Sequence, residues 1–155
     1  MLVLISAVTG ILLSLKKDID LLQPPTQKGI SKSMEAWKPI GELAQIATSV
    51  FYKKHPDQKD NPIDKMDVRP SKGIVKVLFE KGYWEVQIDA TSGEVKSIAR
   101  RHADWIEHLH DGSIISDWFK LISMNTLGIG LLILMGSGMW LWYGPKRIRK
   151  IKRKK

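Results

Sequence analysis

Two apolar runs bracket a polar middle segment in this chain. Residues 121–143 contain no charged side chain over 23 positions, and as a helix they would extend about 35 Å at ~1.5 Å per residue. That length is enough to cross a hydrocarbon core of about 30 Å with a modest tilt. We therefore predict a transmembrane helix over residues 119–143 that Gly144 and Pro145 end. Aromatic side chains favour the headgroup level of a bilayer, and four of them lie at or just before the ends of this run: Trp118, Trp140, Trp142 and Tyr143.

The first apolar run, residues 1–15, is shorter. It would form a helix of about 22 Å, and a usual span needs about 17–25 residues. No basic region opens it and no clear small-residue cleavage site precedes Lys16, so a cleaved signal peptide fits poorly. We expect residues 1–17 to form a transmembrane helix whose beginning is missing. Small residues at four-residue spacing, which also occur by chance in membrane helices, would let a second copy or a partner helix approach closely: Ser6, Gly10 and Ser14.

The pattern between the two runs indicates one domain, residues 18–118, that opens with a helix. Pro24 and Pro25 prevent a continuous helix from the first run. Ser31 or Ser33 is the expected N-cap of an amphipathic helix that reaches about residue 54, and Glu35 would favour its positive end. Pro39 would lie in or near the first turn, or kink the helix there. Apolar residues recur at helical spacing: Ala36, Ile40, Leu43, Ile46, Ala47 and Val50.

Four short runs with β patterns follow this helix. Residues 66–69 are the weakest, residues 74–80 and 83–89 alternate clearly, and residues 95–98 form the fourth. We expect turns at Lys81-Gly82 and at residues 90–93, with Gly93 at positive φ. Trp84 is expected in the core of the sheet, the alternative being a ligand-facing side chain. One helix followed by an antiparallel meander of three or four strands indicates an α+β fold, and residues 103–109 would lead into the second membrane helix as a short helix.

Acidic and basic residues are unevenly distributed along the chain. We therefore interpret its net charge of +9 first as an indication of its orientation in a membrane. All 16 acidic residues lie between Asp18 and Asp117, whereas residues 144–155 hold none. Basic residues beside a membrane helix stay in the cytoplasm, and a long intervening loop crosses largely regardless of its charge. We predict a cytoplasmic tail, residues 144–155, a periplasmic domain, residues 18–118, and no binding of nucleic acid. Eight residues carry the signal: Lys146, Arg147, Arg149, Lys150, Lys152, Arg153, Lys154 and Lys155.

The middle segment shows no convincing catalytic or metal site. The chain has no cysteine, no glycine-rich phosphate loop and no serine in a recognisable nucleophile setting. His108 and His110 would lie about 200° apart around a regular helix, and His102 would lie about 12 Å from His110 along it. We therefore expect no metal site within a single chain. The neighbouring acidic residues could orient an imidazole, but their spacing favours an ordinary solvated helix face: Asp104, Glu107 and Asp111.

The strand region VKVLFEKGYWEVQIDATSGEVKSI resembles the PepSY domain, in which an aromatic strand, an acidic residue and a Thr-x-Gly turn recur. The matching residues are Trp84, Val86, Asp89, Thr91, Gly93 and Val95. The first apolar run and its exit, and the region around the second run, are similar to PepSY-associated transmembrane proteins. The matching parts of that second region are Leu109-His110 with Gly112, Ser137-Gly138 and Leu141-Trp142. Members of this family usually begin with a basic, histidine-containing stretch, whereas this chain starts inside the apolar run.

The resemblance implies a bacterial inner-membrane protein with a periplasmic PepSY-like domain between two membrane helices. Soluble PepSY domains are associated with peptidase propeptides and protease regulation. We expect a membrane-anchored binding or regulatory module without catalytic activity or cofactor, whose partners are the lipid bilayer and a periplasmic protein or protease.

The alternative comes from the larger relatives, which are associated with iron-siderophore uptake and reduction, some with haem between membrane helices. This chain would then be a redox component that holds haem b. His110 would be one axial ligand, paired with a histidine of another helix or protomer. The other interpretation of His110 is an interfacial histidine that bonds to backbone or lipid headgroups.

Overall fold

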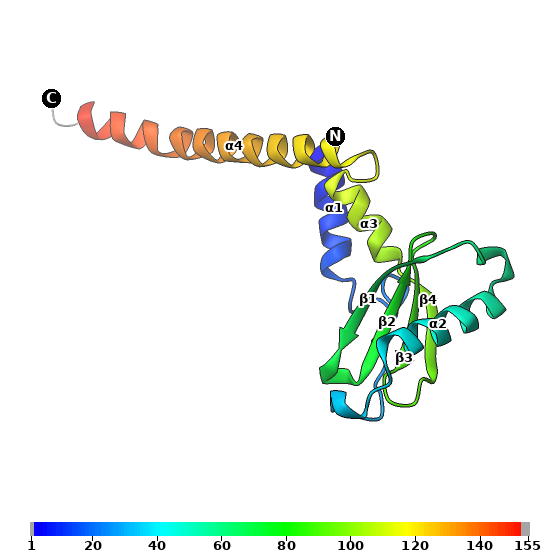
Figure 1. Ribbon diagram of the computed structural model, residues 1–155. Coiled ribbons are helices and arrows are strands. Elements are labelled where there is room, and N and C mark those ends of the chain that lie inside the picture. Colours follow the sequence, from blue (N-terminus) through cyan, green and yellow to red (C-terminus); the bar gives the residue numbers. More distant parts are fainter. Residues whose placement is uncertain (1, 153–155) are drawn as a thin grey trace. The chain divides into compact units, whose positions relative to one another are not determined.

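The computed structural model describes the backbone of residues 2–152 and the side chains of residues 3–144. Contacts divide the chain into two compact units: residues 12–106 form one, and residues 1–11 with residues 107–155 form the other. The helices are α1 (Leu2–Ser14), α2 (Ile40–Lys54), α3 (His102–Asp111) and α4 (Asp117–Lys152). The strands are β1 (Ile63–Arg69), β2 (Ile74–Phe79), β3 (Trp84–Asp89) and β4 (Val95–Arg100) (Figure 1). Short 3-10 turns also occur: η1 (Met34–Ala36), η2 (Pro56–Gln58) and η3 (Pro70–Lys72).

The unit of residues 12–106 is an α+β domain, as predicted. Its strands form one antiparallel sheet in the order β1-β2-β3-β4, which is the expected meander with four strands. Helix α2 covers one face of this sheet (Figure 1). The core between them is apolar, and burial of each large side chain contributes about 1.5–3 kcal/mol. Its fully or almost fully buried members are Leu43, Ala47, Phe51, Val75, Val77, Phe79, Val86, Ile88 and Ala90.

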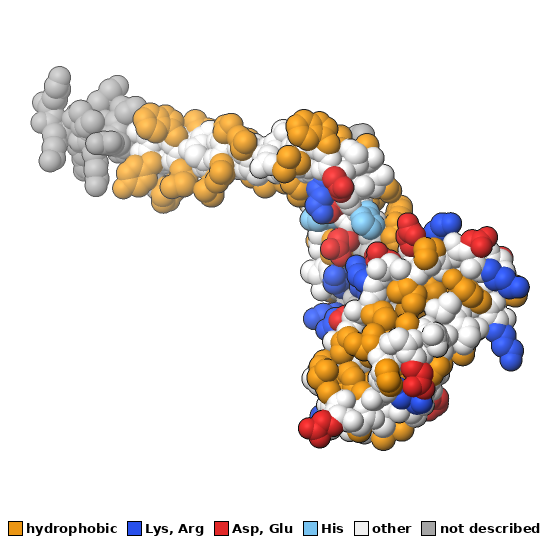
Figure 2. Space-filling model, in the orientation of Figure 1, with side chains coloured by type: hydrophobic (Ala, Val, Ile, Leu, Met, Phe, Trp, Pro, Cys, Tyr) orange, Lys and Arg blue, Asp and Glu red, His pale blue; other side chains and the backbone are white. Residues whose placement is uncertain are grey.

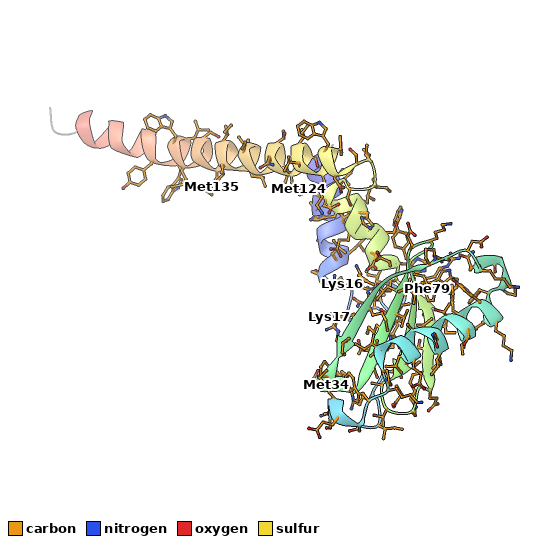
Figure 3. The ribbon with its side chains drawn as sticks, viewed as in Figure 1. Lys16, Lys17, Met34, Phe79, Met124 and Met135 are labelled. Atoms are coloured by element: carbon orange, nitrogen blue, oxygen red, sulfur yellow. The ribbon has the colours of Figure 1, made fainter. Side chains whose placement is uncertain are left out.

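Trp84 packs partly buried against this core, as predicted. The Phe51 ring lies 4.1 Å from that of Phe79, which Figure 3 labels, and 5.7 Å from that of Trp84. The Trp84 ring also faces His55, the C-cap residue of α2, at 4.3 Å between centroids. Aromatic side chains from the helix and both central strands therefore fill one end of the core.

The predicted start of the long helix is wrong. Helix α2 begins at Ile40 with Pro39 as its N-cap, and residues 34–36 form only a 3-10 turn. Pro39 disfavours helical geometry at the residue before it, so the chain stays extended there and cannot join the two segments. Neither predicted serine caps α2, because Ser31 Oγ instead accepts a hydrogen bond from the Ser33 N–H. The acidic residue in the first turn of α2 is Glu42, not Glu35.

Pairing with neighbours lengthens the outer strands beyond their sequence signals. Strand β1 begins at Ile63, opposite Phe79, and β4 continues to Arg100. Strand β3 begins one residue later than predicted, because Gly82 and Tyr83 both have positive φ and form the turn before it. Gly93 has a φ of 80°, as predicted for the turn between β3 and β4.

The chain enters and leaves this domain at one place. The backbone N–H of Ala103, at the start of α3, donates to the carbonyl of Leu22 at 2.7 Å. Leu22 belongs to the segment that follows α1, and α3 leads toward α4. A single backbone hydrogen bond therefore ties the two connections of the domain together.

Helix α4 supplies one candidate membrane span. Residues 117–144 are long and apolar enough to cross a bilayer, and only 6% of the most apolar window is buried. Hydrophobic side chains lie along this helix up to the grey atoms in Figure 2, and Met135, labelled in Figure 3, is 60% exposed. Helix α1 is apolar but has only 13 residues, so the second predicted span is not confirmed.

The predicted end of the membrane helix at Gly144 and Pro145 is wrong, because α4 continues to Lys152. A proline removes one backbone donor, but the lysine and arginine residues that follow it are good helix formers. The aromatic residues at the two ends of the apolar run are all exposed: Trp118, Trp140, Trp142 and Tyr143. Their place at a membrane interface stays a prediction.

Candidate functional site

His110 lies at the end of α3 and contacts α1 within the same compact unit. Its Nδ1 is 2.8 Å from the hydroxyl oxygen of Thr9, and this hydroxyl donates its proton to the carbonyl of Ile5 at 2.6 Å. Because the Thr9 proton is already engaged, Nδ1 is the donor to Thr9 Oγ1. The imidazole then carries its proton on Nδ1 and a lone pair on Nε2. Gly10 makes room for the ring, since a Cβ there would lie 3.5 Å from His110 Cε1.

A polar frame fixes the corner between α3 and α4. Asp111 forms an ion pair with Lys120 at 2.5 Å and accepts the Ser113 N–H at 2.9 Å. Burial would raise the pKa of Asp111, but the hydrogen bonds from Lys120 and Ser113 outweigh it and lower the pKa to about 2. Ser123 Oγ donates to the Asp111 carbonyl, and Gly112 turns the chain with a φ of 80°.

Two of the acidic residues expected on an ordinary solvated helix face form ion pairs. Asp111 is held in the corner by Lys120, and Asp104 pairs with Arg101 at 3.0 Å. Neither carboxylate bonds to an imidazole in the described residues, because His108 Nδ1 contacts the hydroxyl of Ser113 instead. These carboxylates therefore hold helix ends in place.

An apolar cavity of about 140 Å³ adjoins His110. Helix α1, the end of α3, the connecting loop and α4 all contribute walls, and Met124 on α4 is labelled in Figure 3. Ser6 and His110 are among the few lining residues with polar side chains. Two of the three small residues predicted to face a partner helix, Ser6 and Gly10, thus face this corner of their own chain. The aliphatic and aromatic walls are Ile5, Leu109, Ile114, Ile115, Phe119, Met124 and Leu127.

The predicted haem site fits these residues only in part. His110 offers the Nε2 lone pair that an axial ligand needs, with its Nδ1–H held by Thr9. The cavity, however, is smaller than the roughly 300–1,000 Å³ of pockets for drug-sized ligands. His102 belongs to the other unit, and His108 bonds to Ser113. Within the described residues, no group of three or more His, Cys, Asp or Glu side chains is placed to hold a metal ion.

The second face of the sheet carries a buried ionic network that the sequence pattern missed. Lys76 Nζ lies 3.1 Å from Glu85 Oε1, with side chains 2% and 0% exposed. Arg101 approaches the other oxygen of Glu85 at 3.4 Å, and Gln87 donates to Glu85 at 2.7 Å. Removing one member of a buried pair leaves an uncompensated charge, which typically costs 3–5 kcal/mol.

The segment after α1 covers this network. The Gln87 carboxamide pairs with its backbone: Nε2 donates to the Pro25 carbonyl at 3.1 Å and Oε1 accepts the Gln27 N–H at 2.8 Å. The Gly29 N–H donates to the Lys72 carbonyl. A Cβ at Gly29 would lie 1.9 Å from the Gly73 carbonyl oxygen, so only glycine fits there. We call residues 22–31 the strap.

Asp89, the acidic residue of the PepSY-like motif, joins the strap to the β3–β4 turn. Its Oδ2 accepts the Ile30 N–H at 2.7 Å, and its Oδ1 accepts the N–H groups of Thr91 and Ser92. Burial alone would raise the pKa of Asp89, but the backbone donors of Ser92, Ile30 and Thr91 hold it below its usual value. The motif aspartate is thus a structural acceptor in this chain.

The sheet has two outer edges, and they differ in character. Strand β1 has a register irregularity after Ile63, is followed by Pro70 and carries four charged side chains, features that discourage further pairing. Strand β4 is six residues long without proline. Arg101, just beyond it, donates its N–H to the Tyr83 carbonyl. Because hydrogen-bonded pairs alternate along an antiparallel ladder, the backbone groups of Ile98 and Arg100 point away from β3.

The comparison with protein families fits this architecture. The family model of the PepSY-associated TM region matches residues 1–155. The chain belongs to this family, which makes it a membrane-associated, PepSY-related protein. No curated protein and no solved structure matches it.

Proposed function

We propose that this chain is a membrane-anchored binding module that acts without catalysis and presents its PepSY-like domain to a periplasmic protein or protease. Helix α4 anchors the module in the bacterial inner membrane, and the basic tail stays in the cytoplasm. The tail side chains lie outside the described residues, so this orientation rests on the charge pattern of the sequence.

The observation that carries the proposal is the edge of β4, with which no further strand pairs in the described part of the chain. An extended segment of a partner adds to such an edge through main-chain hydrogen bonds, and its alternate side chains give the specificity. The outward N–H and C=O groups of Ile98 and Arg100 supply these bonds. Both faces of the sheet behind the edge are covered, one by α2 and the other by the strap.

The side chains along this edge favour an acidic segment. Lys96 pairs with Glu94 at 2.5 Å, whereas the Arg100 guanidinium lies 4.6 Å above the Trp84 ring. Arg100 is the exposed last residue of β4, and no ion pair within 4 Å is found for it in the described residues. The pKa of Asp57 is lowered mainly by the hydrogen bonds from Gln58 and from the Asp57 backbone, and the charge of Arg100 is one of the weaker causes. A carboxylate on the added strand, opposite Arg100 or two residues from that position, would lie within reach of the Arg100 guanidinium.

A matched pair of substitutions at one position tests the edge. A photo-crosslinking amino acid at position 100 would first identify the partner in cells. The purified partner is then titrated onto the full chain in nanodiscs, as wild type, Arg100→Ala and Arg100→Pro. Arg100→Ala removes the side chain but keeps the outward N–H, whereas Arg100→Pro also removes that donor.

We expect Arg100→Pro to bind about tenfold more weakly than Arg100→Ala, because a lost main-chain hydrogen bond and the proline ring both oppose strand addition. Circular dichroism and thermal midpoints should match between the two variants, since neither change breaks a bond to β3. Equal affinity of the two variants would exclude strand addition at β4.

A redox component that holds haem b is the second candidate, and the observation that favours it is the lone pair on His110 Nε2. Haem would supply one-electron transfer, and this chain would contribute one axial nitrogen, oriented by Thr9. The cavity alone is too small for haem, so haem would extend beyond it toward a histidine of another helix or protomer. An absorption spectrum with a Soret band that is lost in His110→Ala would favour this candidate over the binding module.

A further inference from the structure

The imidazole of His110 is one of the few polar side chains that line the otherwise apolar cavity between α3 and α4. Thr9 holds the proton of the His110 imidazole on Nδ1, which leaves Nε2 as the acceptor. Nε2 has no hydrogen-bond partner within the described part of the chain, and it is not among the fully buried polar atoms that lack one. An acceptor in such surroundings selects a ligand that brings its own donor.

We propose that this cavity binds a single aromatic ring that carries a hydroxyl group, with the hydroxyl donating to His110 Nε2. Phenols, and the reduced ring of a quinol, have this chemistry. The proposal goes beyond the partner-binding role of β4 and depends on none of its residues.

The volume of the cavity sets the size of the ligand. A cavity of roughly 150 Å³ lined by aliphatic and aromatic side chains accommodates benzene, and the cavity beside His110 measures about 140 Å³. The cavity therefore matches one six-membered ring in volume. Residues of α4, the candidate membrane span, line the cavity, so a ligand that partitions into lipid would be concentrated beside it.

The walls match an aromatic ring in chemistry as well as size. Phe119 offers an aromatic neighbour, and the Met124 sulfur is a favourable contact for a ring. The hydroxyl of Ser123 already donates to the carbonyls of Asp111 and Lys120, so it does not compete for Nε2. A hydrogen bond to Nε2 is strengthened by the apolar surroundings.

The first arm of the test compares two probes, phenol and anisole. They share the ring, but anisole has a methyl ether in place of the donor. The full chain, labelled with ¹⁵N-histidine, is purified in detergent, and long-range nitrogen–proton spectra report both ring nitrogens of His110. We expect phenol to shift the Nε2 resonance upfield and leave Nδ1 protonated, while anisole leaves Nε2 unchanged.

The second arm uses variants in the same detergent, so that partition of phenol into micelles is constant. Ser6→Leu fills the cavity and leaves His110 intact, and Thr9→Val removes the group that fixes the tautomer. We expect the affinity for phenol to fall about tenfold in Ser6→Leu and about threefold in Thr9→Val. His102→Asn, in the other compact unit, is the matched control and should bind phenol as the wild type does.

Three outcomes would overturn the proposal. Equal responses to phenol and anisole would show that the cavity takes any apolar group, such as a lipid chain. An unchanged affinity in Ser6→Leu would place the phenol elsewhere. A Soret band in the purified protein that is lost in His110→Ala would show that Nε2 binds haem instead.

Discussion

Single hydrogen bonds decide the chemistry of the most distinctive side chains. One threonine hydroxyl fixes which imidazole nitrogen of His110 is free, and three backbone donors keep the buried Asp89 ionised. Sequence patterns name such residues but do not show their partners, which lie up to 101 positions away along the chain. The same holds for Asp111, whose partner Lys120 lies on the next helix.

The low pKa of Asp111 predicts an acid-sensitive corner between α3 and α4. Its folded-state pKa of about 2 lies below the ordinary value of 3.8, so its ion pair stabilises the fold above pH 4. This contribution, about 1–2 kcal/mol, should be lost as the pH falls from about 4 to 2.

Thermal midpoints of the wild type and Asp111→Asn in one detergent, measured from pH 6 to pH 2, check this expectation. The variant should be less stable at pH 6, and the difference should vanish near pH 2. A difference that stays constant with pH would show that the ion pair is not the cause.

At the scale of elements, the alternation of apolar and polar side chains predicted the strands of the meander. Such alternation is a local property of each strand, so it can be recognised in the sequence. The alternation also placed Lys76 and Glu80 on one face, and Lys76 is buried there with Glu85. The strap that covers this face is polar and rich in proline, so no periodicity marks it as part of the sheet. Opposite charges at diagonal positions of adjacent strands were the available signal, since Lys76 lies opposite Gln87 and Glu85 lies opposite Leu78.

Two glycines give opposite predictions for the same substitution. Gly29→Ala places a Cβ against the Gly73 carbonyl and should destabilise the domain by about 2–3 kcal/mol. Gly41→Ala, in the exposed first turn of α2 with open space around it, should stabilise by about 0.5–1 kcal/mol. Thermal or chemical unfolding of the full chain in one detergent measures both changes. Equal effects would contradict the packing of the strap.

At the scale of the molecule, family membership and α4 indicate association with a membrane, whereas the direction of insertion is inferred from charge. The chain has no cysteine, so a single introduced one reports its own location. We expect a membrane-impermeant maleimide to label Lys32→Cys in intact spheroplasts and Lys154→Cys only after permeabilisation. The reverse pattern would place the domain in the cytoplasm.

The hydrogen bond between Leu22 and Ala103 has a consequence for engineering. A domain whose two chain connections meet at one point can be spliced into a surface loop of a soluble carrier without stretching either joint. We expect that residues 22–103 can be inserted into such a carrier, so that binding at the β4 edge can be measured without lipid.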